Sequence, residues 1–177
     1  MEASLDTGPV RLERRTRIGV EETGGELEAR LAVLGAQALL EVLEDLGAHR
    51  AVPQPEAGVC YASKLTREDA ELDFAEDASA LARRIRALVP RLPATVTTPD
   101  GTRLKLLAAS ALEDAANAAP GTILAIDRAG LSIATGAGRL RVTALQIAGG
   151  KGTRLAGPDL ANALGQRLAA GDELVRG

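Results

Sequence analysis

The sequence predicts a helical N-terminal segment followed by a small closed or partly closed β-barrel with helices at its ends. Apolar residues recur at helical spacing over residues 23–46. From residue 94 the apolar period changes to two, in about five short segments separated by turn residues. The formal net charge is −9 over residues 1–77 and +6 over residues 78–177, which indicates two units, the second suited to a polyanion. The alternative is a chance imbalance on a solvated surface.

Length and composition restrict the class of protein. The 177 residues are 46% hydrophobic and 25% charged, close to the average of globular domains, which excludes fibrous, disordered and disulfide-scaffold proteins. No apolar run approaches ~18 residues, so no membrane-spanning helix is predicted, and the first residues show no secretory signal. One cysteine, Cys60, and one histidine, His49, exclude an internal disulfide and a Cys/His zinc site. We therefore expect a cytoplasmic protein with no metal site and no membrane partner.

The N-terminal part contains one strong helix signal. Residues 9–18 alternate imperfectly between apolar and charged residues and predict a half-exposed strand. Thr23 and Glu26 match a capping box, and Gly47 is a suitable C-terminal stop, so we predict a helix over 23–46. Its apolar face comprises Leu27, Leu31, Leu34, Ala38 and Val42, widened by Leu39, Leu40, Leu43 and Leu46.

A linker and a second helix follow. Pro53 and Pro55 fix extended backbone and bar a helix. Together with the acidic residues that come after them, they predict a semi-rigid linker over 51–77. A helix is then predicted at about 78–89, ended by Pro90. Its apolar face comprises Leu81, Ile85 and Leu88.

The remaining residues predict the barrel. Pro99-Asp100-Gly101 is typical of a turn, so the strands on either side of it are predicted to form a β-hairpin. The predicted elements, in order, are strands 94–98 and 102–106, an Ala-rich excursion 110–120, strands 122–126, 131–135 and 139–147, and a helix 158–168.

Two motifs are candidates for catalysis or for phosphate binding. Asp6-Thr7-Gly8 matches half of the aspartic protease pair, but such an enzyme needs two carboxylates that share a proton, and the alternative is a simple turn. The glycine-rich residues 148–153 are similar to a phosphate loop, but Gly152 separates the lysine from the threonine and breaks the Walker spacing. We interpret them as a basic loop.

Residues 1–10 (MEASLDTGPV) resemble the Met-x-x-Gly-Leu-Asp-Thr-Gly-Pro-Val segment of the methionyl-tRNA formyltransferase family, with Ser4 in place of the usual glycine. The resemblance covers essentially the whole chain, and the Leu-Asp-Thr-Gly and Lys-Leu-Thr-x-Glu-Asp pieces are specific together. Its further segments are Ile18, 22–27, 52–55, 61–70, 100–105, 121–124 and 145–146. One departure lies at 89–94, where the family has an aromatic Asn-Pro-Trp-Pro-Gly-Ala segment.

The resemblance implies an activity and a domain plan. Family members transfer a formyl group from the co-substrate 10-formyltetrahydrofolate to the amino group of initiator methionyl-tRNA. The implied fold is an α/β remnant of a Rossmann-like catalytic domain over residues 1–50, a linker over 51–77, and a tRNA-binding barrel resembling an OB fold over 78–177. Asp6 matches a catalytic aspartate that orients a histidine. The family's upstream Asn-x-His and Ser-Leu-Leu-Pro motifs do not occur in these residues, so we expect an N-terminally truncated chain that binds no cofactor and is inactive alone.

The resemblance also implies tRNA as the partner, and basic side chains of the barrel and linker are the candidates to hold it. Strand residues spaced by two leave the strand on the same side. The candidates are Lys64, Arg103, Lys105, Arg139, Arg141, Lys151 and Arg154. Alternatively these charges only keep the fold soluble. Two other functions stay open, a non-catalytic tRNA-binding module and a fragment of a formyltransferase acting on a nucleotide sugar or another amine. Self-association through helix 23–46 is also expected, because its apolar face would lack a covering sheet.

Overall fold

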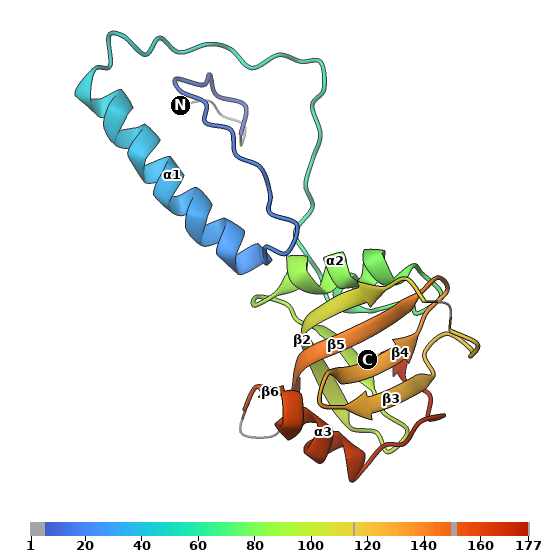
Figure 1. Cartoon of the computed structure of the whole chain (residues 1–177). Helices are drawn as coiled ribbons and strands as arrows, with labels where there is room; N and C mark the ends of the chain where they lie inside the picture. The colour runs from blue at the N-terminus through green and yellow to red at the C-terminus, as the bar shows by residue number, and fades with distance from the viewer. Residues whose placement is uncertain (1–5, 115, 150–151, 177) are drawn as a thin grey trace. The chain divides into compact units, whose positions relative to one another are not determined.

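The chain divides into two compact units in a computed structural model that describes residues 6–114, 116–149 and 152–176. The first unit comprises Met1–Glu22 and Glu26–Lys64, and the second comprises Thr23–Gly25 and Leu65–Gly177. The first unit contains most of the long helix α1 and the second contains the sheet (Figure 1).

The helix α1 spans Gly24–Glu44, which confirms the helix predicted over 23–46. Val42 on its predicted face is buried, and Leu27, Leu34 and Ala38 are half-buried. Five large apolar side chains of the helix are exposed, with exposed fractions of 45–61%. These exposed residues are Leu31, Val33, Leu39, Leu40 and Leu43. We call them the exposed face of α1.

The strand predicted over 9–18 is wrong. Val10 forms an isolated antiparallel bridge with Val52 through two backbone hydrogen bonds of 2.8 Å. No strand is assigned elsewhere in 9–18, where nearly all side chains are exposed. A strand is stabilised by a neighbour and by burial of one face, and this segment has neither along most of its length. The α/β remnant implied for residues 1–50 therefore stays a prediction.

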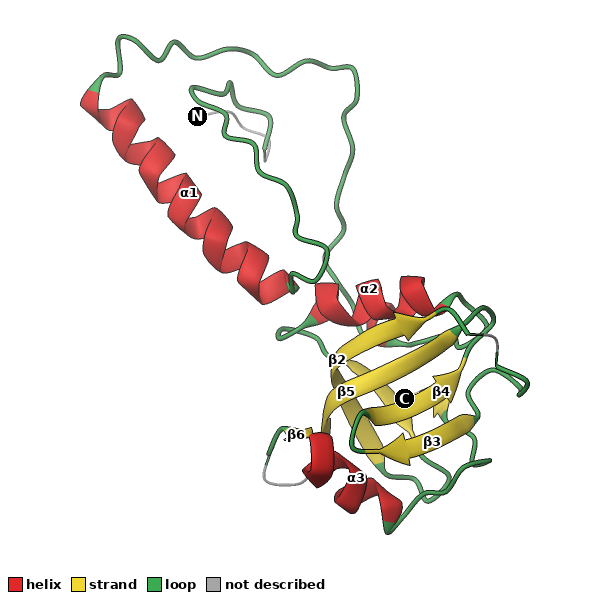
Figure 2. Ribbon diagram, viewed as in Figure 1, coloured by secondary structure: helices red, strands yellow, loops and turns green. Residues whose placement is uncertain are grey.

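The second unit is a small antiparallel sheet curved into a partly closed barrel, with helices at its ends, as predicted. Its elements are η1 (Glu68–Ala70), α2 (Ala78–Leu88), β1 (Ala94–Thr97), β2 (Arg103–Leu112), β3 (Ile123–Asp127), β4 (Gly130–Ala134), β5 (Arg139–Ile147), β6 (Leu155–Ala156), α3 (Gly157–Gly165) and β7 (Val175–Arg176). The strand order is β3-β4-β5-β2-β1-β7, with β6 paired to β5. The helix α2 packs on β2 and β5 and α3 on β3, β4 and β6, so the two helices lie at opposite ends of the sheet (Figure 2).

The C-terminal segment 171–176 bonds to both edges of the sheet. Its strand β7 pairs with β1. Just before β7, the carbonyl oxygen of Asp172 accepts a hydrogen bond from the Ile123 N–H (2.7 Å). The Leu174 N–H donates to the Gly121 carbonyl oxygen (3.0 Å), and the Leu174 side chain is buried. One short segment thus connects the β1 edge to the start of β3 and curves the sheet toward closure.

The core is almost entirely aliphatic, as the composition requires. Alternate residues of β1, β2 and β5 point inward, and the apolar face of α2 covers them. The largest fully buried side chains are Leu72, Leu81, Ile85, Leu104, Leu106, Ile123, Leu131, Ile133, Leu140, Leu145, Leu160 and Leu164.

The boundary of the barrel differs from the linker predicted over 51–77. Contacts place the residues from Leu65 onward in the barrel unit. Leu72 is 0% and Phe74 6% exposed, and both belong to the core. The Phe74 carbonyl oxygen accepts a hydrogen bond from the Gly136 N–H (2.9 Å), and Glu71 bridges β1. The acidic composition favoured a linker, with Phe74 as its only large apolar anchor, because Leu72 and Phe74 alternate with charged residues in an edge segment.

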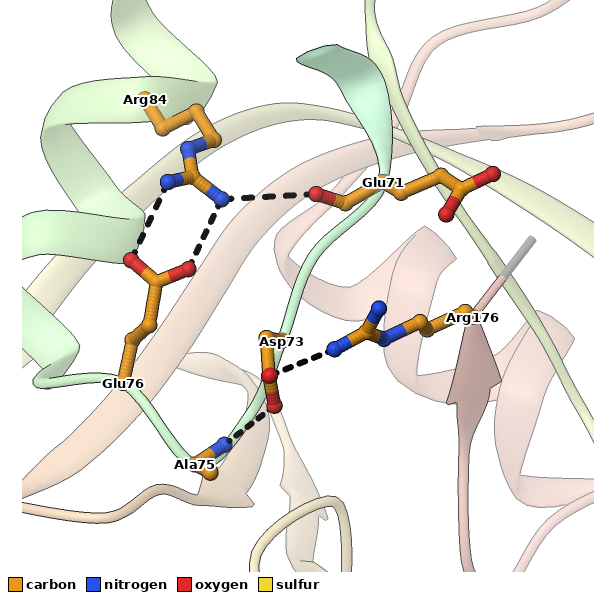
Figure 3. A network of polar contacts seen from close by, with 6 residues as sticks. All are labelled: Glu71, Asp73, Ala75, Glu76, Arg84 and Arg176. Carbon is orange, nitrogen blue, oxygen red and sulfur yellow. Dashed lines mark hydrogen bonds and ion pairs between the residues drawn. The ribbon is translucent and has the colours of Figure 1, made fainter. Parts of the chain in front are cut away.

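Polar contacts hold this segment in place (Figure 3). The Arg84 guanidinium of α2 donates to both carboxylate oxygens of Glu76 (2.9 and 3.1 Å) and to the Glu71 carbonyl oxygen (3.4 Å). Asp73 accepts from the Ala75 N–H (3.0 Å) and pairs with Arg176 of β7. The segment before α2 is therefore joined to both α2 and the C-terminal strand.

The other predicted helices and strands are confirmed, although some of them end at different residues than predicted. The hairpin, the strands at 122–126, 131–135 and 139–147, and the helix at 78–89 all form. The strand β2 continues to Leu112 along β5, so the Ala-rich excursion starts after it rather than at residue 110. The helix α3 ends at Gly165 instead of 168. The two-residue strands β6 and β7 are too short to show a periodic pattern and were not predicted.

Candidate nucleic-acid interface

Two predicted tRNA-binding residues, Arg103 and Lys105, lie on the outward face of β2. They are exposed and alternate with the buried Leu104 and Leu106, so the predicted same-side arrangement is present. Among the described residues, neither side chain has a hydrogen-bond or ion-pair partner. Unpaired exposed cations on one strand face are available to an anionic partner.

The neighbours of Lys105 across the sheet are polar. Thr95 on β1 and Gln146 on β5 lie in register with Lys105. The Gln146 amide donates to the Gly152 carbonyl oxygen (2.6 Å), which places Gly152 beside this face. The outward surface of β1, β2 and β5 at this end of the sheet is therefore polar and basic.

Arg139 and Arg141 lie at the other end of β5 and are engaged within the fold. Both alternate with buried residues and are half-buried. Arg139 forms an ion pair with Asp114, and its Nε atom is buried without a hydrogen-bond partner in the described part of the chain. The Arg141 Nε donates to the hydroxyl of the buried Ser132 (3.1 Å). Their charges are less available to a ligand than those of Arg103 and Lys105.

The remaining predicted cations are dispersed. Arg154 is exposed and directly precedes β6. Lys64 is exposed and belongs to the first unit. Lys151 lies outside the described residues.

Sequence reasoning missed Arg167, which lies with Arg103 around a surface depression of about 540 Å³. We call it the hairpin depression. Its lining residues are Gly101, Thr102, Arg103, Ile147, Ala148, Gly149 and Arg167. The predicted helix 158–168 would have placed Arg167 on a helix surface, whereas α3 ends at Gly165 and the Arg167 N–H donates to the Leu164 carbonyl oxygen (2.8 Å). No local pattern in the sequence connects Arg167 to the hairpin.

The hairpin turn carries a carboxylate, that of Asp100, which pairs with Arg167. Asp100 accepts a hydrogen bond from the Thr102 N–H (3.0 Å) and contacts the Thr98 hydroxyl. These hydrogen bonds, first that of the Thr98 hydroxyl, lower the pKa of Asp100 and keep it ionised. Its other carboxylate oxygen lies 4.0 Å from the Arg167 guanidinium.

Asp6, the predicted catalytic residue, lies in an exposed turn of the first unit with a φ of +59°. The Gln54 side-chain amide donates to the Asp6 (2.9 Å) and Gly8 (2.7 Å) carbonyl oxygens and fixes this turn. The His49 Nε2 atom lies 3.9 Å from the Glu41 carboxylate.

The first unit also contains a strong ion pair that sequence reasoning missed. The Arg30 guanidinium donates to both carboxylate oxygens of Glu22 (2.8 and 2.7 Å), to the Thr16 hydroxyl and to the Arg17 carbonyl oxygen (3.0 Å). The Glu22 carboxylate also accepts the Gly19 N–H (2.9 Å). The hydrogen bonds from Arg30, and then that from Gly19, lower the pKa of Glu22 to about 2. The bidentate pair therefore attaches the loop 16–22 to α1.

The described residues contain no cluster of three His, Cys, Asp or Glu side chains able to hold a metal ion. Within the same residues, each helix is too short or too polar to cross a lipid bilayer.

Residues 64–163 match the family described as "Formyl transferase, C-terminal domain". The chain belongs to this formyl transferase family. The match begins at Lys64 and ends within α3, so it includes Arg103, Lys105 and Arg154. It does not include Arg167 or the C-terminal segment.

Two curated relatives of this formyl transferase chain are methionyl-tRNA formyltransferases. The chain is 51% identical over 154 residues to the methionyl-tRNA formyltransferase of Xanthomonas campestris pv. campestris (strain 8004), covering 85% of this chain and 50% of the relative. It is 46% identical over 173 residues to that of Ectopseudomonas mendocina (strain ymp), covering 97% of this chain and 54% of the relative. The chain spans about half the length of the curated relatives it matches.

A solved structure shows the same fold. HypX from Aquifex aeolicus, in complex with tetrahydrofolic acid, matches with a TM-score of 0.66 and 20% identity. The match covers 93% of this chain and 28% of HypX. At this level of identity the likeness concerns the fold alone.

Proposed function

We propose that this chain provides the C-terminal half of a methionyl-tRNA formyltransferase. In this reaction a formyl group passes from 10-formyltetrahydrofolate to the amino group of initiator methionyl-tRNA. The observation that carries the proposal is the 51% identity to a methionyl-tRNA formyltransferase over 85% of the chain, which extends beyond the matched C-terminal domain. That extent favours this function over formylation of a nucleotide sugar or another amine.

The barrel holds the tRNA in this proposal. Small barrels of the OB type bind nucleic acids on a strand face, and the strand face around Lys105 is polar and basic. Residues 78–177 contain no Phe, Tyr or Trp, so base stacking on aromatic side chains is excluded there. The barrel therefore contacts phosphates, and its affinity falls steeply with salt because each neutralised phosphate releases counterions.

The reaction itself depends on residues beyond those of this chain. The amino nitrogen attacks the formyl carbon, and donors that stabilise the developing oxyanion are needed. The family resemblance assigns this role to an Asn-x-His pair, and residues 1–177 contain no such pair. Asp6 is the residue of this chain that we assign to the site, where it orients that histidine. The folate is a co-substrate, and we assign it no residue of this chain.

A chimera tests the proposal. The N-terminal half of the Xanthomonas campestris relative, joined to this chain, is expected to formylate methionyl-tRNA, whereas residues 1–177 alone give no product above background. Asp6→Ala in the chimera is expected to lower the rate, while Arg128→Ala, on the β3–β4 turn, does not. A folded chimera that does not formylate methionyl-tRNA would refute the proposal, as would turnover by residues 1–177 alone.

The second candidate is a tRNA-binding module without catalysis. The observation that favours it is the pair of exposed cations on β2, Arg103 and Lys105, whose side chains have no hydrogen-bond or ion-pair partner among the described residues. The chimera distinguishes the two candidates, because a chain that only binds tRNA would give a chimera that binds tRNA but does not formylate it.

The proposed partners follow from the same argument. Initiator methionyl-tRNA is the substrate, and the cytoplasm, where translation starts, is the proposed location. The exposed face of α1 is the surface that we propose for self-association.

A further inference from the structure

The hairpin depression brings together two arginines from distant parts of the chain. Arg103 is the first residue of β2, and Arg167 follows α3. The volume of about 540 Å³ lies in the range of ligand pockets. Glycine and alanine form much of the lining, and a Cβ atom added at Gly101 or Gly149 would meet nothing within 4 Å. A bulky anion can therefore approach both guanidinium groups.

The backbone beneath each arginine is anchored. The Arg103 carbonyl oxygen accepts a hydrogen bond from the Ala148 N–H (2.8 Å), which joins β2 to the residues after β5. Arg167 and the buried Leu168 both donate their N–H groups to the Leu164 carbonyl oxygen (2.8 Å each). The backbone at both arginines is thus fixed and both side chains are exposed, so binding a ligand does not require the backbone to be ordered.

Asp100 does not neutralise this pair of cations. One of its carboxylate oxygens accepts hydrogen bonds from the Thr98 hydroxyl and the Thr102 N–H within the turn. The other lies 4.0 Å from the Arg167 guanidinium. The Arg167 guanidinium also lies 3.4 Å from the Thr102 hydroxyl. These are weak, exposed contacts that a better acceptor can replace. Two arginines against one carboxylate leave a net positive depression.

We propose that the hairpin depression binds one phosphate group of an RNA backbone, with Arg103 and Arg167 as its ligands. The planar guanidinium fork matches phosphate oxygens in two-point contacts. Lys105 leaves β2 on the same side as Arg103 and continues the positive surface to the next phosphate. The inference rests on the proposed function, of which it names the contact site, and it includes Arg167, which the family match omits.

The experiment measures binding of a labelled tRNA transcript to the full 177-residue chain over a series of salt concentrations. Arg103→Ala and Arg167→Ala are each expected to weaken binding several-fold and to reduce the slope of log affinity against log salt by about 0.7–0.9. Asp100→Asn retains the acceptor for the turn and removes the negative charge, so it is expected to strengthen binding. Arg128→Ala removes the same charge at the β3–β4 turn and serves as the matched control. It is expected to weaken tRNA binding by less than half as much as Arg103→Ala or Arg167→Ala.

A second arm identifies the source of the phosphate. In NMR spectra, the side-chain Nε–H signals of Arg103 and Arg167 are expected to shift at tRNA concentrations at least about a hundredfold below those of inorganic phosphate, since neighbouring phosphates add contacts. Equal effects of Arg167→Ala and Arg128→Ala on tRNA binding would overturn the site and leave the proposed function standing. If inorganic phosphate saturates the signals as tightly as tRNA, the RNA assignment is overturned. A wild-type chain that does not bind tRNA at all would refute the tRNA-holding role itself.

Discussion

Replacing Phe74 with alanine tests whether the segment before α2 is part of the barrel core. The Phe74 side chain is 6% exposed and is the one phenylalanine of the chain. Truncating a buried phenylalanine to alanine costs about 3–5 kcal/mol, through lost burial and the remaining cavity. A domain of this size is stable by about 5–15 kcal/mol. Phe74→Ala should therefore remove a large part of the barrel's free energy of unfolding.

A urea titration measures this loss. NMR cross-peaks of β5 report on the barrel separately from α1. With a denaturant slope of about 1–3 kcal/mol per molar urea, the unfolding midpoint is expected to fall by at least about 1 M. Tyr61→Ala is the matched control, because Tyr61 is the other aromatic residue and is 93% exposed. It should change stability by less than about 0.5 kcal/mol. If both variants shift the midpoint equally, the assignment of this segment to the core is wrong.

Three further outcomes are expected. Leu40→Lys and Leu43→Lys change the exposed face of α1 and should lower the mass measured by sedimentation at high protein concentration. The helix content should not fall. An unchanged mass would refute self-association through this face. Because the pKa of Glu22 is about 2 in the folded chain against an ordinary 4.5, its stabilisation is present above pH ~4.5 and is lost as the pH falls toward 2. The Gly19 amide signal should accordingly titrate near pH 2, and a midpoint near 4.5 would contradict the ion pair. Gly136→Ala should lower stability by about 1–3 kcal/mol or more in a thermal melt, because its Cβ would lie 1.9 Å from a carbonyl oxygen of the segment before α2; an unchanged melting temperature would show that this close approach is absent.

The sequence determined the elements whose signals are local. The helix α1 follows from leucines at helical spacing, and α2 follows from Leu81, Ile85 and Leu88 ahead of Pro90. The hairpin follows from Pro99-Asp100-Gly101, because the turn residues and the alternation on either side of them agree. These signals depend on neighbours a few residues apart, so they can be read without the fold.

Only part of the candidate nucleic-acid interface could be predicted from such local patterns. Alternation placed Arg103 and Lys105 on one outward face, and the structure agrees. Alternation also selected Arg139 and Arg141, but it could not show that Asp114 and Ser132 engage them. Whether an outward cation is available depends on which residues of other elements lie beside it.

Only the tertiary structure decided the features that join distant segments. Leu72 and Phe74 appear in an acidic stretch and become core residues only because β1 and the β4–β5 turn receive them. β7 is two residues long and exists because β1 offers an unpaired edge. Arg167 lines the same depression as Arg103 because α3 ends at Gly165 and the chain continues beside the hairpin. In each case the deciding contact is long-range, and no local period of the chain encodes it.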